Sequence, residues 1–286
     1  RDDLTQIGKF GIGFKSVYAY TDSPRVYSRD EAFCIRNYVH PKAAPRVSLA
    51  KDETLFVLPF DHQDVASDNA FKEIGLRLRD LGVRTFLFLR NIDEIRWSIH
   101  SEGKGDYIRE TTPVETESPA RRIYILAQVE GRGESEEEWL VFSRPLDRSA
   151  LRVEVAYQLA VGEDEADRGV VPTRHAKLAA FFETDLETHL RFLIQGPYRT
   201  TPARDNIPGY DPENQRLVRE TAALVADSIT YVKRMGMLTV SFLNVLPISS
   251  SDFPQGSMFR PIFDEVLTKL KRSEEHTSEL QSLLII

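Results

Sequence analysis

Residues 7–17 read Ile7-Gly8-Lys9-Phe10-Gly11-Ile12-Gly13-Phe14-Lys15-Ser16-Val17. This stretch places three glycines within six positions and leads into a segment whose apolar residues Phe14, Val17 and Tyr18 recur at helical spacing. Such glycines let consecutive backbone N–H groups converge on an anion beside a helix N-terminus. The stretch, called the glycine box below, therefore predicts a phosphate-binding loop that feeds a short helix.

The order of the glycines separates this loop from two common phosphate loops. A dinucleotide fingerprint needs Gly-x-Gly-x-x-Gly after a strand, and a Walker loop needs four residues before Gly-Lys-Ser/Thr. The sequence has Gly-x-x-Gly-x-Gly-Phe instead. A glycine-rich turn that merely lets a helix pack closely on a sheet is the structural alternative.

The pattern after the glycine box predicts an α/β layer structure that extends to about Ile99. Short runs rich in β-branched and aromatic residues indicate antiparallel strands, and apolar steps of three and four indicate a helix. The expected strands lie at 25–28, 33–38, 54–60 and 85–89, and the helix runs from Ser67 or Asp68 to Gly82.

A change of texture near His100 predicts a second domain over 100–250, followed by the start of a further segment at 251–271. Asp211 and Pro212 are expected to open a long helix that ends at Gly236. The acidic stretches 134–138 and 162–167 are expected to be solvated hairpin tips. The expected strands of this domain lie at 122–129, 138–142, 151–159, 190–194 and 238–246.

The composition is that of a folded protein that works in water. Of its 286 residues, 41% are hydrophobic and 28% are charged, which excludes collagen-like and wholly disordered classes. The net charge of −7 argues against nucleic acid or an anionic membrane as the main partner. Cys34 is the lone cysteine and the six histidines lack ligand spacing, so no protein-built metal site is predicted. A cytoplasmic location is expected.

Both ends of the sequence look artificial. The chain begins at Arg1 rather than Met, in the middle of polar residues, so its beginning is expected to be missing. Residues 272–282 resemble the translation of a common sequencing adapter, so 272–286 is expected to be a non-native tail. Native sequence would then run to about Lys271. A natural charged helical tail is the alternative.

The glycine box, together with Tyr18 and Asp22, resembles the ATP-lid box of the GHKL ATPases, and among them the heat shock protein 90-like and sacsin-type ATP-binding domains. The resemblance implies the C-terminal part of a Bergerat-type ATP-binding domain, a two-layer α+β sandwich, over 1–99. It also implies that 1–6 belong to a mobile lid. The residues that it implies for nucleotide binding, mainly through backbone N–H groups, are Gly8, Phe10, Gly11, Ile12, Gly13 and Phe14.

Two further residues are candidates for nucleotide binding. Lys15 is placed to reach a phosphate, although a solvated lysine on the helix surface explains it equally well. Thr54 resembles the late-strand threonine that reaches adenine in the family, but Glu53 stands where the family has glycine. A β-favouring threonine on a strand face is the alternative for Thr54.

The second domain resembles the middle domain of these chaperones, which has the fold of domain 2 of ribosomal protein S5. Its loop Thr200-Thr201-Pro202-Ala203-Arg204-Asp205-Asn206-Ile207 resembles the loop that carries an arginine to the nucleotide. The resemblance makes Arg204 the candidate catalytic contact of the γ-phosphate, in the manner of an arginine finger. A surface ion pair of Arg204 with Asp205 or Glu220 is the alternative.

The resemblance implies ATP with Mg²⁺ as cofactor and an ATPase that switches conformation to regulate a protein client or partner, with a homodimer as the expected full-length form. The family's glutamate base and Mg²⁺-binding asparagine lie upstream of the motifs present here. This chain by itself is therefore expected not to hydrolyse ATP. The alternative, from another class, is an interaction scaffold that keeps the fold without turning over nucleotide.

Overall fold

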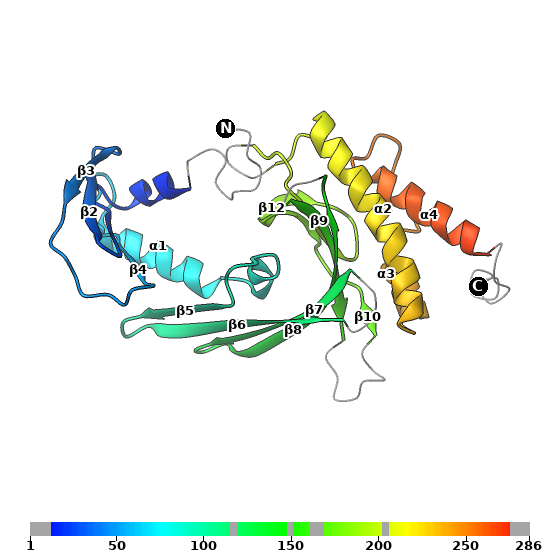
Figure 1. Cartoon of the computed structure of the whole chain (residues 1–286), viewed down its shortest axis with the longest axis horizontal. Helices are drawn as coiled ribbons and strands as arrows, with labels where there is room; N and C mark the ends of the chain where they lie inside the picture. Colours follow the sequence, from blue (N-terminus) through cyan, green and yellow to red (C-terminus); the bar gives the residue numbers. More distant parts are fainter. Residues whose placement is uncertain (1–12, 115–118, 148–150, 161–168, 202–205, 275–286) are drawn as a thin grey trace. The chain divides into compact units, whose positions relative to one another are not determined.

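The computed structural model describes residues 13–114, 119–147, 151–160, 169–201 and 206–274 (Figure 1). Helices and both antiparallel and parallel strand pairs are present, which confirms a mixed α/β structure of the α+β class. The chain divides into two compact units, Arg1–Leu81 and Gly82–Ile286. Each unit has its own sheet.

Unit 1 is built on a four-stranded antiparallel sheet in the order β3-β2-β1-β4. The predicted strand at 25–28 is confirmed in place, the one predicted at 33–38 lies two residues earlier, and the one predicted at 54–60 ends at Val57. The added strand β3 follows a turn at Asn37 and Tyr38, whose φ angles are positive. The bounds are η1 (Phe14–Ala19), β1 (Arg25–Ser28), β2 (Glu31–Arg36), β3 (His40–Ala43), β4 (Thr54–Val57) and α1 (Ser67–Arg79).

The predicted helix of unit 1 is confirmed as α1. Its N-cap is Ala66, one residue before the expected start, and no side chain caps its first turn. Asp68 in the first turn and Arg77 and Arg79 in the last suit the helix dipole. The helix ends at Arg79, three residues before Gly82, where the N–H of Asp80 bonds the carbonyl of Leu76 at 2.9 Å.

Unit 2 is built on a nine-stranded sheet in the order β12-β11-β13-β9-β8-β7-β6-β5, with β10 paired to β9. The strand pairs are antiparallel except β11 with β13. The strands are β5 (Glu94–Ile99), β6 (Gly103–Pro113), β7 (Ala120–Val129), β8 (Gly133–Pro145), β9 (Arg152–Leu159), β10 (Val170–Val171), β11 (Lys177–Ala180), β12 (Phe182–Glu187) and β13 (Leu193–Gln195).

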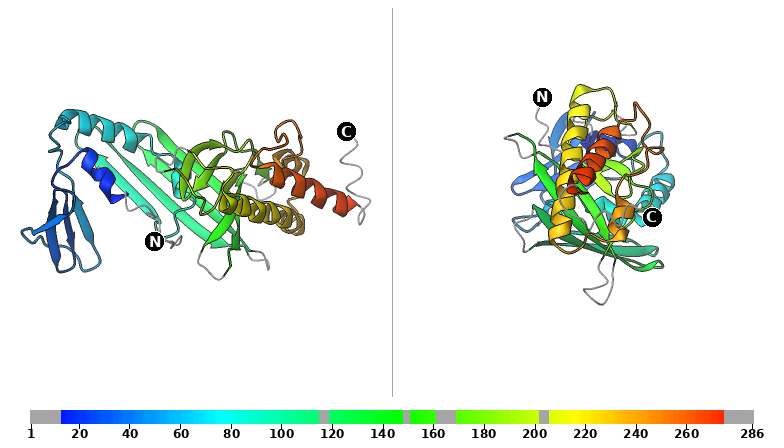
Figure 2. Two further views of the ribbon diagram at one scale, coloured as in Figure 1. Left: turned by 90° about the horizontal axis from the view of Figure 1, so that it is seen from above. Right: turned by 90° about the vertical axis from the view of Figure 1, so that its right-hand side faces the viewer.

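Three helices of unit 2 form one hydrophobic core with one face of this sheet. They are α2 (Pro212–Arg234), α3 (Val240–Val245) and α4 (Arg260–Glu274), and α2 and α4 lie side by side (Figure 2). The start of α2 is confirmed, because the Asp211 carboxylate accepts the N–H groups of Glu213 and Asn214. Its apolar residues repeat at helical spacing and fill the core.

The division after Leu81 differs from the expected boundary at Ile99. Strand β5 pairs with β6 along its whole length, from Glu94 opposite Ile108 to Ile99 opposite Gly103. The segment before β5 also contacts β7 and β8 through the 3₁₀ helix η2 (Val83–Phe86). Helix α4 belongs to the same core through residues such as Ile262 and Val266, so 251–271 is not structurally separate from unit 2.

Two predicted strands are wrong. Residues 83–86 form η2 instead, and the apolar run at 85–89 reflects burial, since Phe86 and Leu87 are almost fully covered. Residues 240–245 form α3, which begins where Thr239 Oγ1 accepts the N–H of Phe242 at 3.3 Å. In both places the run of apolar residues is short, and such runs do not distinguish a strand from a helical turn.

The acidic stretch 134–138 is a strand and not a hairpin tip, because it lies within β8. Its carboxylates are held by neighbours on the sheet. Tyr124 Oη donates to Glu136 at 2.6 Å, and Trp139 Nε1 donates to Glu137 at 3.0 Å. The hydrogen bond to Glu136, burial and the surrounding carboxylates raise the pKa of Tyr124 to about 12. The second acidic stretch, at 162–167, lies outside the described residues.

Candidate functional site

The glycine box is described only from Gly13 onward. Gly8, Phe10, Gly11 and Ile12 lie outside the described residues. Gly13 has helical angles, φ −55° and ψ −53°, and an added Cβ there would meet no atom of the described residues within 4 Å. The described part of unit 1 therefore does not itself require glycine at this position. A requirement for glycine here would come from a ligand or another chain segment that approaches the backbone closely.

Helix η1 begins directly after Gly13, as the sequence predicts. Ser16 holds its first turn, because Oγ of Ser16 donates to the Gly13 carbonyl at 2.7 Å. Lys15 is exposed and forms no hydrogen bond or ion pair with the described part of the chain. Among the described residues, none competes with a ligand or water for its ammonium group.

The face of β4 that carries Thr54 meets the end of the glycine box through an aromatic contact. The ring centroids of Phe14 and Phe56 lie 6.2 Å apart. Thr54 and Phe56 are two residues apart on β4, so their side chains share one face of the strand. Thr54 Oγ1 lies 2.7 Å from the Oγ of Ser28, its register partner on β1. The structure thus brings Phe14 and the Thr54 face together within unit 1.

A carboxylate fixes the chain where it leaves η1. Asp61 Oδ1 accepts Thr21 Oγ1 at 2.9 Å and the N–H of Asp22 at 2.8 Å, while Oδ2 accepts Ser23 Oγ. Thr21 and Ser23 are almost completely buried. Burial acts to raise the pKa of Asp61, but these hydrogen bonds outweigh it and hold the pKa below its ordinary value. Sequence reasoning missed Asp61, although the polar run 21–23 after a helix is a local signal of a cap.

Replacing Asp61 with alanine is expected to destabilise the protein by about 1–2 kcal/mol, because two buried hydroxyls lose their acceptor. The carboxylate contributes fully above the ordinary pKa of aspartate, and its contribution is lost as pH falls through the lowered folded-state pKa. Urea unfolding at pH 7 and at pH 3 measures both effects. Asp64→Ala, which changes a nearby exposed carboxylate, is the control. An equal loss in both variants at pH 7 would contradict the role of Asp61.

Arg204 lies outside the described residues. The described ends of its loop are fixed to the start of α2. The buried Asn214 accepts the N–H of Arg199 at 2.8 Å and donates to the carbonyls of Arg199 and Pro208, each at 3.0 Å. Glu220, one alternative partner of Arg204, lies 3.6 Å from Arg144. Sequence reasoning missed Asn214, which holds both ends of the loop.

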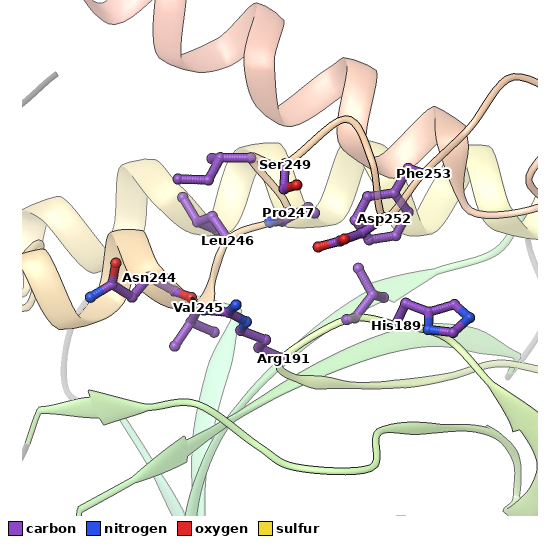
Figure 3. Close-up of a pocket in the computed structure, with 11 residues that line it drawn as sticks. His189, Arg191, Asn244, Val245, Leu246, Pro247, Ser249, Asp252 and Phe253 are labelled. Carbon is purple, nitrogen blue, oxygen red and sulfur yellow. Dashed lines mark hydrogen bonds between the residues drawn. The ribbon is translucent and has the colours of Figure 1, made fainter.

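Unit 2 also has a pocket of about 160 Å³ between the segment 189–191 and the connection from α3 toward α4 (Figure 3). Arg191 Nη1 donates to the carbonyl of Asn244 at 2.9 Å on its wall. His189 and Asp252 also line it. The described candidate residues Gly13, Phe14, Lys15 and Thr54 do not line this pocket. Its polar groups suit a small hydrogen-bonding molecule, with nothing specific to a nucleotide.

The comparisons with known proteins show a distant similarity. No protein-family model matches the chain, and no solved structure matches it. The chain is similar to Protein NO VEIN of Arabidopsis thaliana, with 24% identity over 275 residues that cover 85% of the chain. It spans about a tenth of that relative's length, 10%. Among the described helices, none is long and apolar enough to cross a membrane.

Proposed function

We propose that this chain is part of a heat shock protein 90-like or sacsin-type GHKL ATPase, in which the glycine box holds the phosphates of Mg·ATP. In this proposal 1–81 contains the C-terminal part of a Bergerat-type domain, and unit 2 is a chaperone-type middle domain. The parent protein would use ATP-driven closure to regulate a protein client or partner in the cytoplasm.

The observation that carries the proposal is the contact of Phe14 with Phe56. This contact sets the end of the glycine box against the strand face that carries Thr54. The resemblance implies that the glycine box binds the phosphates and that Thr54 reaches the adenine. Gly13 also supports the proposal, because no atom of the described residues lies within 4 Å of an added Cβ there, which leaves its backbone open to a phosphate on that side. The residues would act through backbone N–H groups, and bound Mg²⁺ would neutralise phosphate charge.

Replacing Gly11 or Gly13 with valine in the full-length protein is expected to abolish Mg·ATP binding, because a side chain would occupy the space of the phosphate. Calorimetric titration measures the affinity. Gly169→Val is the matched control, since an added Cβ at Gly169 also meets no described atom within 4 Å. For Gly13→Val the melting temperature is expected to stay near that of the wild type. Unchanged affinity in both glycine-box variants would remove the phosphate-binding role.

The second candidate function is a non-catalytic interaction scaffold. It is favoured by apolar side chains that unit 1 leaves exposed, such as Tyr38 at 58%, Val39 at 67% and Phe56 at 53%. A scaffold would bind its partner equally well with and without ATP. The ATPase proposal instead expects the interaction with the partner to change on addition of Mg·ATP.

A further inference from the structure

A row of polar side chains crosses the face of the unit 2 sheet that is opposite its helices. Each residue of the row is adjacent in sequence to a residue whose side chain packs in the core with α2. Because side chains alternate along a strand, the residues of the row lie on the other face of the sheet. They belong to β7, β8, β9 and β13, which are consecutive in the sheet. The row consists of Arg121, Ser143, Glu154 and Gln195.

Glu154 is the centre of this row and is completely buried. Its Oε1 accepts Arg121 Nη2 at 2.7 Å and Ser143 Oγ at 2.9 Å. Arg121 Nη1 also lies 2.5 Å from Ser143 Oγ. The guanidinium of Arg90 approaches from the segment before β5, with Nη2 at 3.5 Å from Glu154 Oε2. The carboxylate is thus shared between two arginines.

A third arginine adds positive charge beside this pair. Arg152 precedes Glu154 by two residues on β9, so it shares the same face, and it forms no ion pair with the described residues. Burial lowers the pKa of Arg90, Glu154 opposes this, and the charges of Arg152 and Arg121 lower the pKa further. Arg121 and Arg152 are therefore both close enough to influence Arg90, and Glu154 pairs with Arg90 and Arg121.

The arginines are not fully enclosed. The side chains of Arg90 and Arg121 are 32% and 20% exposed, and Arg152 is partly exposed. A guanidinium carries five N–H donors, and the two hydrogen bonds of Arg121 leave others available. Beside Glu154, its register partner Gln195 is 1% exposed, and its Oε1 accepts no hydrogen bond from the described residues. Within the described residues, the Gln195 amide oxygen therefore lacks a donor, while N–H groups that remain available for an anion belong to the Arg121 guanidinium.

We propose that Arg90, Arg121 and Arg152 form an anion site for a phosphate group, in which Glu154 orients the first two guanidiniums. Planar guanidiniums recognise phosphate oxygens bidentately, which suits arginine better than lysine for this task. The site lies within unit 2, goes beyond the proposed function and does not use the glycine box. Its ligand is a small molecule with one or more phosphate groups, either free polyphosphate or the phosphate tail of a nucleotide.

Calorimetric titration of the chain with inorganic tripolyphosphate at low salt tests the site. The wild type is expected to bind, and its affinity is expected to fall with rising ionic strength. Arg152→Gln is expected to weaken binding at least about tenfold, because it removes a charge-assisted contact. Arg219→Gln, which removes one exposed charge from α2, is the matched control and is expected to stay within about twofold. Absence of binding in the wild type, or an equal loss in the control, would overturn the proposal.

Glu154→Gln separates a ligand site from a purely structural ion cluster. It keeps an acceptor for Arg121 and Ser143 but removes the competing negative charge, so it is expected to strengthen tripolyphosphate binding several-fold in folded protein. Weaker binding by folded Glu154→Gln would contradict an anion site. If this variant does not fold, the comparison of Arg152→Gln with Arg219→Gln decides.

Two further titrations identify the source of the phosphate and separate this proposal from the proposed ATP site. ATP that binds as tightly as tripolyphosphate, and loses as much affinity in Arg152→Gln, indicates a nucleotide tail; weaker ATP binding indicates free polyphosphate. Gly11→Val is expected to leave tripolyphosphate binding unchanged. If Gly11→Val abolishes it, the anion binds at the glycine box and the arginine site is wrong.

Discussion

Replacing Arg204 with alanine in the full-length protein is expected to lower kcat for ATP hydrolysis by on the order of 10³, while ATP affinity changes little. This expectation rests on the proposed function. An arginine delivered by the second domain would meet the γ-phosphate only in the closed state, so it would stabilise the transition state and add little to ground-state binding. Steady-state hydrolysis and calorimetric ATP titration measure the two quantities separately.

Arg199→Ala is the matched control for Arg204. Both arginines belong to the segment between β13 and α2, but the Arg199 guanidinium is engaged with Asp211, with Nη1 3.3 Å from Oδ2. Its backbone is held by Asn214. If Arg204→Ala keeps the wild-type kcat, or if Arg199→Ala loses as much, Arg204 is a surface residue and the second domain does not take part in catalysis.

The elements that the sequence predicted well are those whose signals are local. Helix α2 has Asp211 as N-cap, Pro212 in its first turn and Gly236 just beyond its end, and all three act within one turn of the helix. Such features depend on neighbouring residues alone, so the sequence displays them directly.

The errors arose where tertiary packing decides. The apolar residues at 85–89 lie partly within the 3₁₀ helix η2 and partly just after it. They are buried because this segment packs against β7 and β8 and does not pair as a further strand. Conversely, Glu136 and Glu137 lie within a strand because Tyr124 and Trp139 accommodate their carboxylates. Hydrophobicity and charge report where a residue is buried, and only secondarily in which element.

The candidate site shows the same division between local and distant signals. Its glycine box is contiguous, so a phosphate loop could be predicted from spacing. The Asp61 network could not, because Thr21 and Asp61 are 40 positions apart and meet only in the folded unit. The row around Glu154 also joins distant positions, with Arg121 33 positions before it. Residues that position a site can therefore be identified only from the folded structure. Residues of a contiguous ligand-binding motif can be predicted from the sequence.

Replacing Gly105 with alanine is expected to destabilise unit 2 by about 2–3 kcal/mol. Gly105 lies directly opposite Trp97 on the β5–β6 pair, and the indole covers it. An added Cβ would lie 2.5 Å from Cε2 and Nε1 of Trp97, which is inside van der Waals contact. Trp97 is only 8% exposed and its ring is rigid, so relief requires the ring to leave its place or the two strands to separate.

Chemical denaturation measures this loss, and Gly82→Ala is the matched control, because the nearest atom to an added Cβ there is Thr85 Oγ1 at 4.0 Å. The clash, and not glycine's backbone freedom, is the expected cause. Trp97→Leu in the Gly105→Ala background is therefore expected to recover part of the lost stability, and the double-mutant cycle is expected to show a coupling of about 1 kcal/mol or more. If the stability losses of Gly105→Ala and Trp97→Leu simply add, the clash with the indole is not the cause. The strain must then lie in the β6 backbone itself.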